Sequence, residues 1–160
     1  MIAGIKTSYA LCEVIGELGD EAGSFARLEP LQWLQEIDAE VSWVFDQAPV
    51  SAAPTRNVVG HAQIYGPPDV AWARDLAAQM GGQAQYLLVI GRFFVKPSKH
   101  DYNMARFLLR ESVRYTDRHA AAAALDPESR ALVPSSLPAK LGFTEVPTEE
   151  GGQLVRTPNG

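Results

Sequence analysis

Residues 87–109, LLVIGRFFVKPSKHDYNMARFLL, constrain the fold more than any other segment. Leu87–Val95 is an almost continuous apolar run with β-branched and aromatic residues, which predicts a buried strand stopped by Pro97. From Ala105 the apolar residues recur at helical spacing with arginines on the opposite side, which predicts an amphipathic helix that ends near His119. A buried strand followed by a short loop and a helix is typical of an α/β fold.

The connection between this strand and this helix, Ser98–Met104, is predicted to bind an anion. The first backbone N–H groups of a helix have no intrahelical partner, and they carry the positive end of the helix dipole. Residues 92–118 contain seven basic and three acidic residues, whereas the whole chain has 14 Lys and Arg against 19 Asp and Glu. This local excess favours a small phosphorylated ligand over nucleic acid, which needs a broader basic face. Alternatively, Arg110, Arg114 and Arg118 only solvate the outer face of the helix.

The composition fits one domain over residues 1–160. A chain of this length with 46% hydrophobic residues can bury a substantial core without disulfides or metals. Cys12 is the single cysteine, so no internal disulfide forms, and no Cys/His cluster suggests a metal site. No stretch has the pattern of a signal peptide or the length of an apolar membrane span. We therefore expect a cytoplasmic protein that binds neither membranes nor nucleic acid.

The segments before residue 87 predict two strands and two helices. Val41–Phe45 and Asn57–Tyr65 have the β-branched and aromatic content of strands. Asp69 is a good N-cap for a helix over Val70–Met80. A further helix is expected around Glu29–Ile37, at the end of an N-terminal segment that glycines interrupt.

The order of these elements and their motifs resemble the GNAT N-acetyltransferase superfamily. The strand end Val95-Lys96-Pro97 matches the Val-x-Pro of the family's motif A. The loop His100–Ala105 stands where the family has (Gln/Arg)-x-x-Gly-x-(Gly/Ala), the segment that cradles the pyrophosphate of acetyl-CoA. Ala105 fits this pattern strictly, His100 takes the Gln/Arg place, and Asn103, which tolerates a left-handed backbone, takes the Gly place.

The resemblance extends over residues 41–156. The segment NVVGHAQIY resembles the family's strand beside the acceptor side of the cleft, and Leu141-Gly142-Phe143 matches a Leu-Gly-Phe before the last strands. The resemblance implies a single domain with a mixed central β-sheet flanked by helices. It also implies an acetyl-CoA-dependent N-acetyltransferase that acts on a primary amine of a small molecule or a protein. Acetyl-CoA and the amine would be its partners, and a homodimer is left open.

The same resemblance assigns roles to individual residues. On the acceptor side, His61 is expected to accept a proton from the ammonium substrate and Tyr65 to line the pocket. The alternative for both is structural: a buried histidine and a tyrosine that closes the strand. No metal is expected. The residues expected to hold acetyl-CoA, on the strand and in the segment after it, are Phe93, Phe94, Val95, His100, Asp101, Tyr102, Asn103, Met104, Ala105 and Arg106.

Two positions depart from the family's pattern. Members usually have a tyrosine that protonates the departing thiolate and an asparagine that contacts pantetheine, and here these positions are Pro138 and Ala131. Pro134 and Pro138 also predict a short or broken helix. The alternative function is therefore a catalytically weakened CoA-binding or protein-interaction module on the same fold. A phosphosugar- or nucleotide-binding α/β domain is less favoured because the chain has no G-x-G-x-x-G or P-loop motif.

Overall fold

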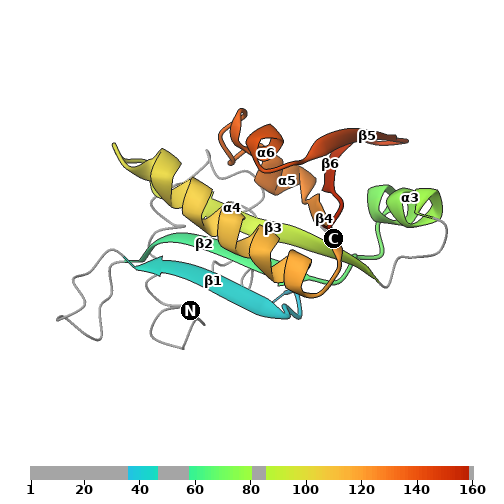
Figure 1. The fold of residues 1–160 in the computed structure, drawn as a ribbon, viewed down its shortest axis with the longest axis horizontal. Helices are drawn as coiled ribbons and strands as arrows, with labels where there is room; N and C mark the ends of the chain where they lie inside the picture. Colours follow the sequence, from blue (N-terminus) through green and yellow to red (C-terminus); the bar gives the residue numbers. More distant parts are fainter. Residues whose placement is uncertain (1–35, 47–57, 81–85, 159–160) are drawn as a thin grey trace.

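The computed structural model describes residues 36–46, 58–80 and 86–158. Within them, six strands form one mixed sheet in the order β1-β2-β3-β4-β6-β5, and helices flank it (Figure 1). The mixed central sheet with flanking helices that the sequence predicts is therefore confirmed. The strands are β1 Val41–Asp46, β2 Val58–Tyr65, β3 Leu87–Val95, β4 Ala122–Leu125, β5 Thr144–Thr148 and β6 Gly151–Arg156. The helices are α3 Ala71–Gln79, α4 Asp101–Arg118, α5 Pro127–Arg130 and α6 Leu137–Lys140.

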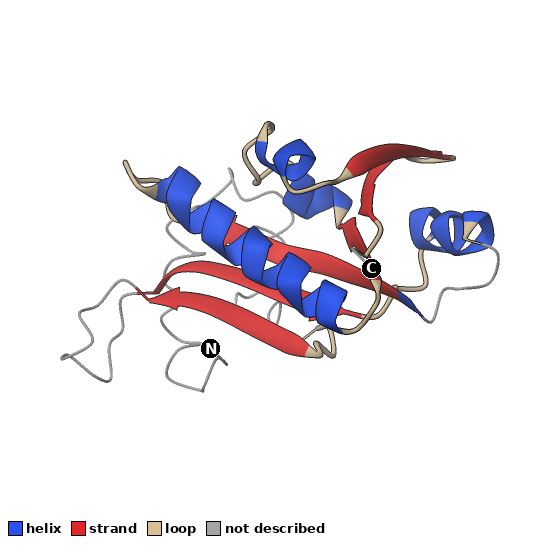
Figure 2. Cartoon of the chain, in the orientation of Figure 1, coloured by secondary structure: helices blue, strands red, loops and turns tan. Residues whose placement is uncertain are grey.

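The sheet combines an antiparallel half with one parallel connection. β1, β2 and β3 are antiparallel neighbours, whereas β3 and β4 run parallel. A parallel pair needs a crossover connection, and α4 supplies it. β6 pairs antiparallel with both β4 and β5, so the C-terminal hairpin completes the sheet (Figure 2). The carboxyl end of β4 therefore lies beside the middle of β3, where Leu125 pairs with Ile90.

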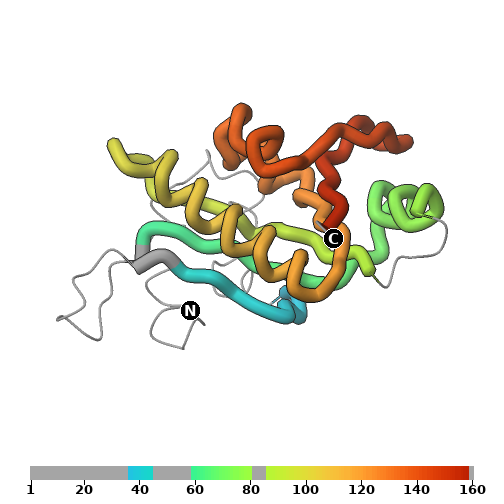
Figure 3. The backbone as a smooth tube through the Cα atoms, viewed as in Figure 1, coloured from blue at the N-terminus to red at the C-terminus, as the bar shows by residue number. Residues whose placement is uncertain are grey.

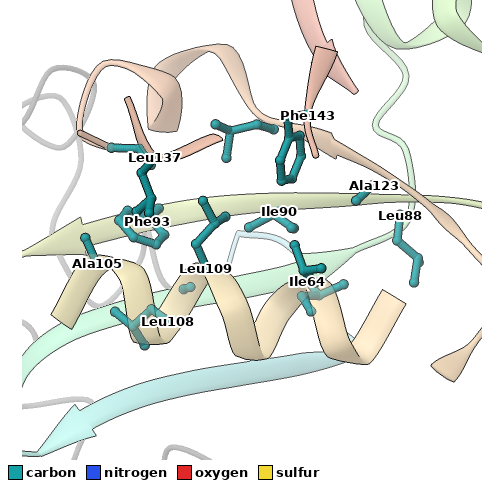
Figure 4. Close-up of a cluster of buried hydrophobic side chains, with 14 of the residues drawn as sticks. Ile64, Leu88, Ile90, Phe93, Ala105, Leu108, Leu109, Ala123, Leu137 and Phe143 are labelled. Atoms are coloured by element: carbon teal, nitrogen blue, oxygen red, sulfur yellow. The ribbon is translucent and has the colours of Figure 1, made fainter. Parts of the chain in front are cut away.

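α4 lies across one face of the sheet (Figure 3). The side of the helix that is buried there is mainly apolar. Phe93 of β3 and Leu108 and Leu109 of α4 are among the largest fully buried side chains of this core (Figure 4). Each such side chain contributes about 1.5–3 kcal/mol relative to an exposed one, so the apolar stripe holds α4 on the sheet. The buried residues of α4 are Met104, Ala105, Leu108, Leu109, Ser112, Val113 and Thr116. On the opposite side, Arg106, Arg114 and Arg118 are exposed.

α3 packs against the other face of the sheet. Trp72, Ala73 and Leu76 are buried there, in one cluster with Leu87 and Val89 of β3. β4 consists mainly of alanine, AAAL, so it leaves room for these larger side chains. Both faces of β3 are covered, which explains why its sequence is continuously apolar instead of alternating.

The helix after β3 begins four residues earlier than the apolar pattern indicates. α4 starts at Asp101, so His100–Ala105 is the N-cap and first helical turn and not a loop. Asp101 and Asn103 are exposed, so this turn has no apolar stripe that would mark it as helical. The expectation of a left-handed backbone at Asn103 is wrong, because among the described non-glycine residues only Arg92 and Ala120 have positive φ.

The other boundaries of strands and helices that the sequence predicts agree with the structure, except at the start of α3. Asp69 does not cap this helix: the N-cap is Val70, and Asp69 instead pairs with Arg74 at 2.9 Å. The helix interrupted by prolines is broken as predicted, because α5 and α6 have only four residues each. The helix expected around residues 29–37 lies largely outside the described residues.

Candidate active site

β3 contains a bulge at Arg92. This residue has φ of 47°, and the register between β2 and β3 shifts between His61 and Gln63. One extra residue in a strand changes which face the following side chains occupy. Ile90 and Phe93 therefore belong to the same core on the α4 side although they are three positions apart (Figure 4). On the other side of the sheet, His61 Nδ1 lies 2.7 Å from the Arg92 carbonyl oxygen and holds the bulge in place.

β4 stops pairing with β3 just before this bulge. The last pair is Ile90 with Leu125, and the Asp126 N–H then donates to the Ile90 carbonyl at 2.9 Å. Beyond this point the chain turns into α5, and the Phe93 N–H donates to Ser129 Oγ at 3.2 Å instead of to a neighbouring strand. Within the described residues, the last part of β3 therefore has one edge without a partner strand, which we call the open edge (residues 91–95). An extended ligand can add to such an edge through backbone hydrogen bonds.

The N-terminus of α4 follows the open edge directly. Lys96 donates its N–H to the Val59 carbonyl of β2 at 2.7 Å, so strand alternation directs the Val95 N–H toward the open edge. At the start of the helix, the Asp101 carboxylate accepts the Tyr102 N–H at 2.7 Å. A phosphate that used this N–H would have to displace the Asp101 side chain.

A cavity of about 600 Å³ lies beside the bulge, at the carboxyl ends of β2 and β4. Ile37, Tyr65 and Trp72 contribute to its apolar wall. Among the described residues, its charged lining consists of Glu36, Arg92, Asp126, Glu128 and Glu150. These are four carboxylates and one guanidinium, a net charge of −3 when all are ionised, and the Arg92 guanidinium lies 2.6 Å from Glu36. A cavity with this balance attracts cations.

Solved structures share this architecture, although no protein-family model and no curated protein match the sequence. YhbS of Escherichia coli, a GNAT family N-acetyltransferase solved with CoA, aligns with a TM-score of 0.60 at 14% identity, over 98% of this chain and 79% of its own. A provisionally named phosphinothricin N-acetyltransferase aligns with 0.62 at 11% identity, over 100% and 98%. The aminoglycoside 6'-N-acetyltransferase of Enterococcus faecium aligns with 0.56 at 10%, over 96% and 92%. The chain has the GNAT fold.

The residues that were predicted to hold the cofactor differ in which of their groups a ligand can reach. Phe93 and Val95 have their N–H groups on the open edge, whereas Phe94 is paired with β2. The side chains of Met104 and Ala105 are on the buried side of α4, so only the backbone groups of these residues can contact a ligand. The predicted residues that are exposed at the start of α4 are His100, Asp101, Asn103 and Arg106.

Tyr102, in the first turn of α4, contacts Lys140 of α6. Lys140 Nζ donates to the Tyr102 hydroxyl at 3.3 Å and lies 5.8 Å from the centre of its ring. The hydrogen bond from Lys140 lowers the pKa of Tyr102. Tyr102 thus brings a phenol to the helix that contains Pro138. The sequence had no signal for the contact with Lys140, because it joins residues that are 38 positions apart.

Tyr65 lies at the end of β2 and lines the cavity. It is 3% exposed. Burial raises the pKa of Tyr65 well above its usual value, and the negative charge of Asp126 adds to the shift, so the phenol stays protonated. A Cβ atom at Gly91 would lie 2.8 Å from the Tyr65 ring, so only glycine allows the ring to pack on β3 at this point.

His61 lies beneath the bulge and does not line the described cavity. It is 1% exposed, and its ring stacks on Phe94 with 5.5 Å between ring centres. Burial lowers the pKa of His61 to about 4, although the hydrogen bond to the Arg92 carbonyl opposes this shift. Because the ring is neutral at pH 7, Nδ1 carries the proton and donates it to the carbonyl oxygen. His61 thus positions Arg92, and its predicted role as a base remains a prediction.

The buried neutral state of His61 should make stability depend on pH. Unfolded His61 binds a proton below about pH 6.5, whereas the folded protein resists protonation down to about pH 4. Its contribution is therefore present above pH 6.5 and is lost as the pH falls, by about 3 kcal/mol at pH 4. The free energy of unfolding measured with urea should fall as the pH falls across this range, and His61→Gln should reduce this pH dependence. The control is His119→Gln, at an exposed histidine, and an equal slope in parent and His61→Gln would contradict the assignment.

Asp126 and Ser129 are site residues that sequence reasoning missed. Asp126 is the N-cap of α5 and accepts the Ser129 N–H at 3.2 Å, while Ser129 Oγ accepts from Phe93. Burial raises the pKa of Asp126, and the hydrogen bond from the Ser129 N–H partly opposes the shift. The segment Asp126-Pro127 was a usable signal, because an aspartate followed by proline directly after a strand is typical of a helix start.

No set of three or more His, Cys, Asp and Glu residues in the described segments is arranged to bind a metal ion. Nor do those segments include a helix with the length and apolarity that a membrane span requires.

Proposed function

We propose that this chain is an acetyl-CoA-dependent N-acetyltransferase that acts on a primary amine. The observation that carries the proposal is the open edge of β3, which leads from the acidic cavity at Arg92 to the start of α4 after Val95. An extended thioester added to this edge would place its phosphates at the N-terminus of α4 and its acetyl group beside the bulge. The similarity in fold to Escherichia coli YhbS, solved in complex with CoA, supports the same cofactor.

In this proposal the acceptor reaches the thioester as a free amine. Asp126, at the end of β4, takes a proton from the ammonium group in the cavity. The nitrogen then attacks the thioester carbonyl, a C–N bond forms, and the C–S bond breaks. CoA leaves as a thiolate, and the proton that the nitrogen loses as the amide forms passes to solvent. The Phe93 N–H, which Ser129 holds in the structure, is a donor for the developing oxyanion. Tyr65, still protonated, contacts the acceptor side.

The departure of CoA does not depend on a tyrosine at position 138. A thiol ionises near pH 8.5, so a thiolate is a tolerable leaving group. A positioned general acid typically contributes about 10²–10⁴-fold, so its loss slows the reaction without abolishing it. We therefore expect slow turnover, measured as free thiol released from acetyl-CoA in the presence of amines.

Acetyl-CoA should raise the melting temperature of the protein. At one hundred times its Kd, a ligand that binds only the folded state adds about 2.7 kcal/mol to the free energy of unfolding. For a domain of this size that corresponds to about 5–10 °C. Thermal unfolding with acetyl-CoA, CoA and pantetheine measures the effect, and pantetheine, which lacks the phosphates, is the control expected to shift less. An unchanged melting temperature at millimolar acetyl-CoA would contradict any function that needs CoA.

Arg106→Glu should weaken CoA binding about tenfold at low salt. Arg106 is exposed in the second turn of α4, and reversing its charge removes one attraction to phosphate and adds one repulsion. Salt screens such exposed charges, so the loss should shrink at high salt. Calorimetry with CoA at two salt concentrations measures it. Arg114→Glu, farther along the same exposed side, is the matched control, and equal effects of both variants would place the phosphates elsewhere.

A catalytically weakened CoA-binding or protein-interaction module is the second candidate. Pro138 in place of the family's tyrosine favours it, and so does Ser129, whose hydroxyl already occupies the Phe93 N–H on the open edge. Such a module would bind CoA and release no thiol above the hydrolysis background with any amine. Thiol release together with calorimetry therefore separates the two candidates.

A further inference from the structure

We propose that the Ser129 hydroxyl donates a hydrogen bond to the sulfur of CoA as the thioester breaks. The inference rests on the proposed function, because it names a further catalytic residue for the same reaction. Pro138 has no hydroxyl to offer the departing thiolate, and the developing oxyanion takes the Phe93 N–H, so the sulfur still needs a donor. The Ser129 hydroxyl lies on the open edge itself, where it contacts Phe93.

The hydroxyl hydrogen of Ser129 is not used within the described residues. Ser129 is 3% exposed, and its Oγ accepts the Phe93 N–H at 3.2 Å. A hydroxyl group can accept and donate at once, yet no acceptor in residues 36–46, 58–80 and 86–158 receives this hydrogen. A buried donor normally has a partner, because leaving it without one costs free energy. The open edge therefore has one more hydrogen bond to give to a ligand.

The neighbours of Ser129 place its hydroxyl between the cavity and the open edge. Residues 126–128, which precede it directly, line the cavity, whereas the Ser129 hydroxyl contacts β3. In the proposed complex the acetyl group lies beside the bulge at Arg92 and pantetheine continues toward Val95, so the sulfur passes Phe93. The ligand carbonyl then takes the Phe93 N–H, which releases the Ser129 oxygen to turn its hydrogen toward the sulfur.

The hydroxyl acts as a hydrogen-bond donor and keeps its proton. An alcohol is a much weaker acid than a thiol, so the hydrogen stays on Ser129 Oγ while the C–S bond breaks and its electron pair goes to sulfur. Solvent protonates the thiolate after CoA leaves. Hydrogen bonds to charged groups are stronger than those to neutral groups, so this one favours the bound thiolate over the bound thiol. It should therefore lower the pKa of the CoA thiol in the complex.

The pKa of the CoA thiol bound to the full-length protein tests this inference without an acceptor amine. Ultraviolet absorbance of the thiolate, followed against pH, measures it. We expect a pKa below the roughly 8.5 of a free thiol in the parent, and a pKa about 1–2 higher in Ser129→Ala than in the parent. Ser112→Ala is the matched control and should keep the parental pKa. Ser112 is also buried, but its hydroxyl donates to the Leu108 carbonyl at 2.8 Å.

Desulfo-CoA, which lacks only the sulfur, isolates the contact with Ser129 from its other effects. Above the pKa of the bound thiol, calorimetry should show that Ser129→Ala weakens CoA binding about tenfold more than desulfo-CoA binding. The same thiol pKa in parent and Ser129→Ala, or a parental value no lower than that of free CoA, would overturn the inference and leave the proposed function standing. A lowered thiol pKa that depends on Ser129, with no thiol release to any amine, would support the contact and contradict the proposed function instead.

Discussion

Replacing Arg156 by methionine should lower the free energy of unfolding by about 3–5 kcal/mol. Arg156 in β6 is 5% exposed, and its two terminal nitrogens lie 2.5 and 2.9 Å from the carboxylate oxygens of Asp117 near the end of α4. Its Nε donates to the Leu141 carbonyl at 2.9 Å. Methionine keeps much of the apolar volume but leaves the Asp117 carboxylate and the Leu141 carbonyl without this partner. The variant therefore loses the ion pair that joins β6 to α4.

Arg74→Met is the matched control for this prediction. Arg74 pairs with Asp69 at the same kind of distance, 2.9 Å, but the two side chains are 66% and 88% exposed. Exposed pairs contribute about 0–1 kcal/mol, so chemical denaturation should show a small change. A second variant, Arg156→Met with Asp117→Leu, should recover part of the loss because no buried charge remains. Equal costs for Arg156→Met and Arg74→Met would contradict the assignment.

Asp126→Asn should lower kcat/KM about 10²–10⁴-fold while stability and CoA affinity change little. Asparagine is as good an N-cap as aspartate, so the Ser129 N–H keeps its acceptor and α5 keeps its start. The variant loses only the group proposed to accept the proton. Burial raises the pKa of Asp126, so the rate of the parent should rise with pH as this carboxyl group ionises. That limb of the pH profile should be absent in Asp126→Asn.

Glu145→Gln controls for the loss of one negative charge. Glu145 is exposed on β5, outside the cavity lining, where it pairs with Arg130 at 3.5 Å. Its kcat/KM should match that of the parent across the pH range. If Asp126→Asn binds CoA and turns over at the parental rate, another group removes the proton. His61→Gln would then test the base that the sequence predicted.

The buried strand and the long helix were predictable because burial requires apolar residues at a regular spacing along the sequence. The apolar run of Leu87–Val95 corresponds to β3 over its whole length, and the helical spacing of α4 correctly located its C-terminal end. The prolines correctly predicted the broken helix before Phe143, because proline removes a backbone donor whatever surrounds it. The start of α4 was missed because the exposed Asp101 and Asn103 alternate with Tyr102 and Met104 in its first turn, and this spacing is not helical.

The candidate site was less predictable because its residues meet through distant contacts. Tyr65 ends the predicted strand and lines the cavity, whereas Asp126 and Ser129 were not singled out from the sequence. The Phe93 N–H meets Ser129 across 36 positions, and His61 meets the Arg92 carbonyl across 31. No local pattern of charge or hydrophobicity records such pairs. The predicted cofactor loop likewise proved to be the first turn of a helix, in which Asp101 already accepts the Tyr102 N–H.

The sequence by itself determined which segments are strands and helices, their order, and the resemblance to GNAT proteins, because these depend on side-chain periodicity, proline and short motifs. Only the tertiary structure decided where the sheet opens and which charges surround the opening. The bulge at Arg92 exists because β2 pairs with β3 on both sides of one extra residue, and the open edge exists because β4 ends at Leu125. Both features depend on how strands pair in three dimensions, so the cavity beside the bulge could be identified only from the tertiary structure.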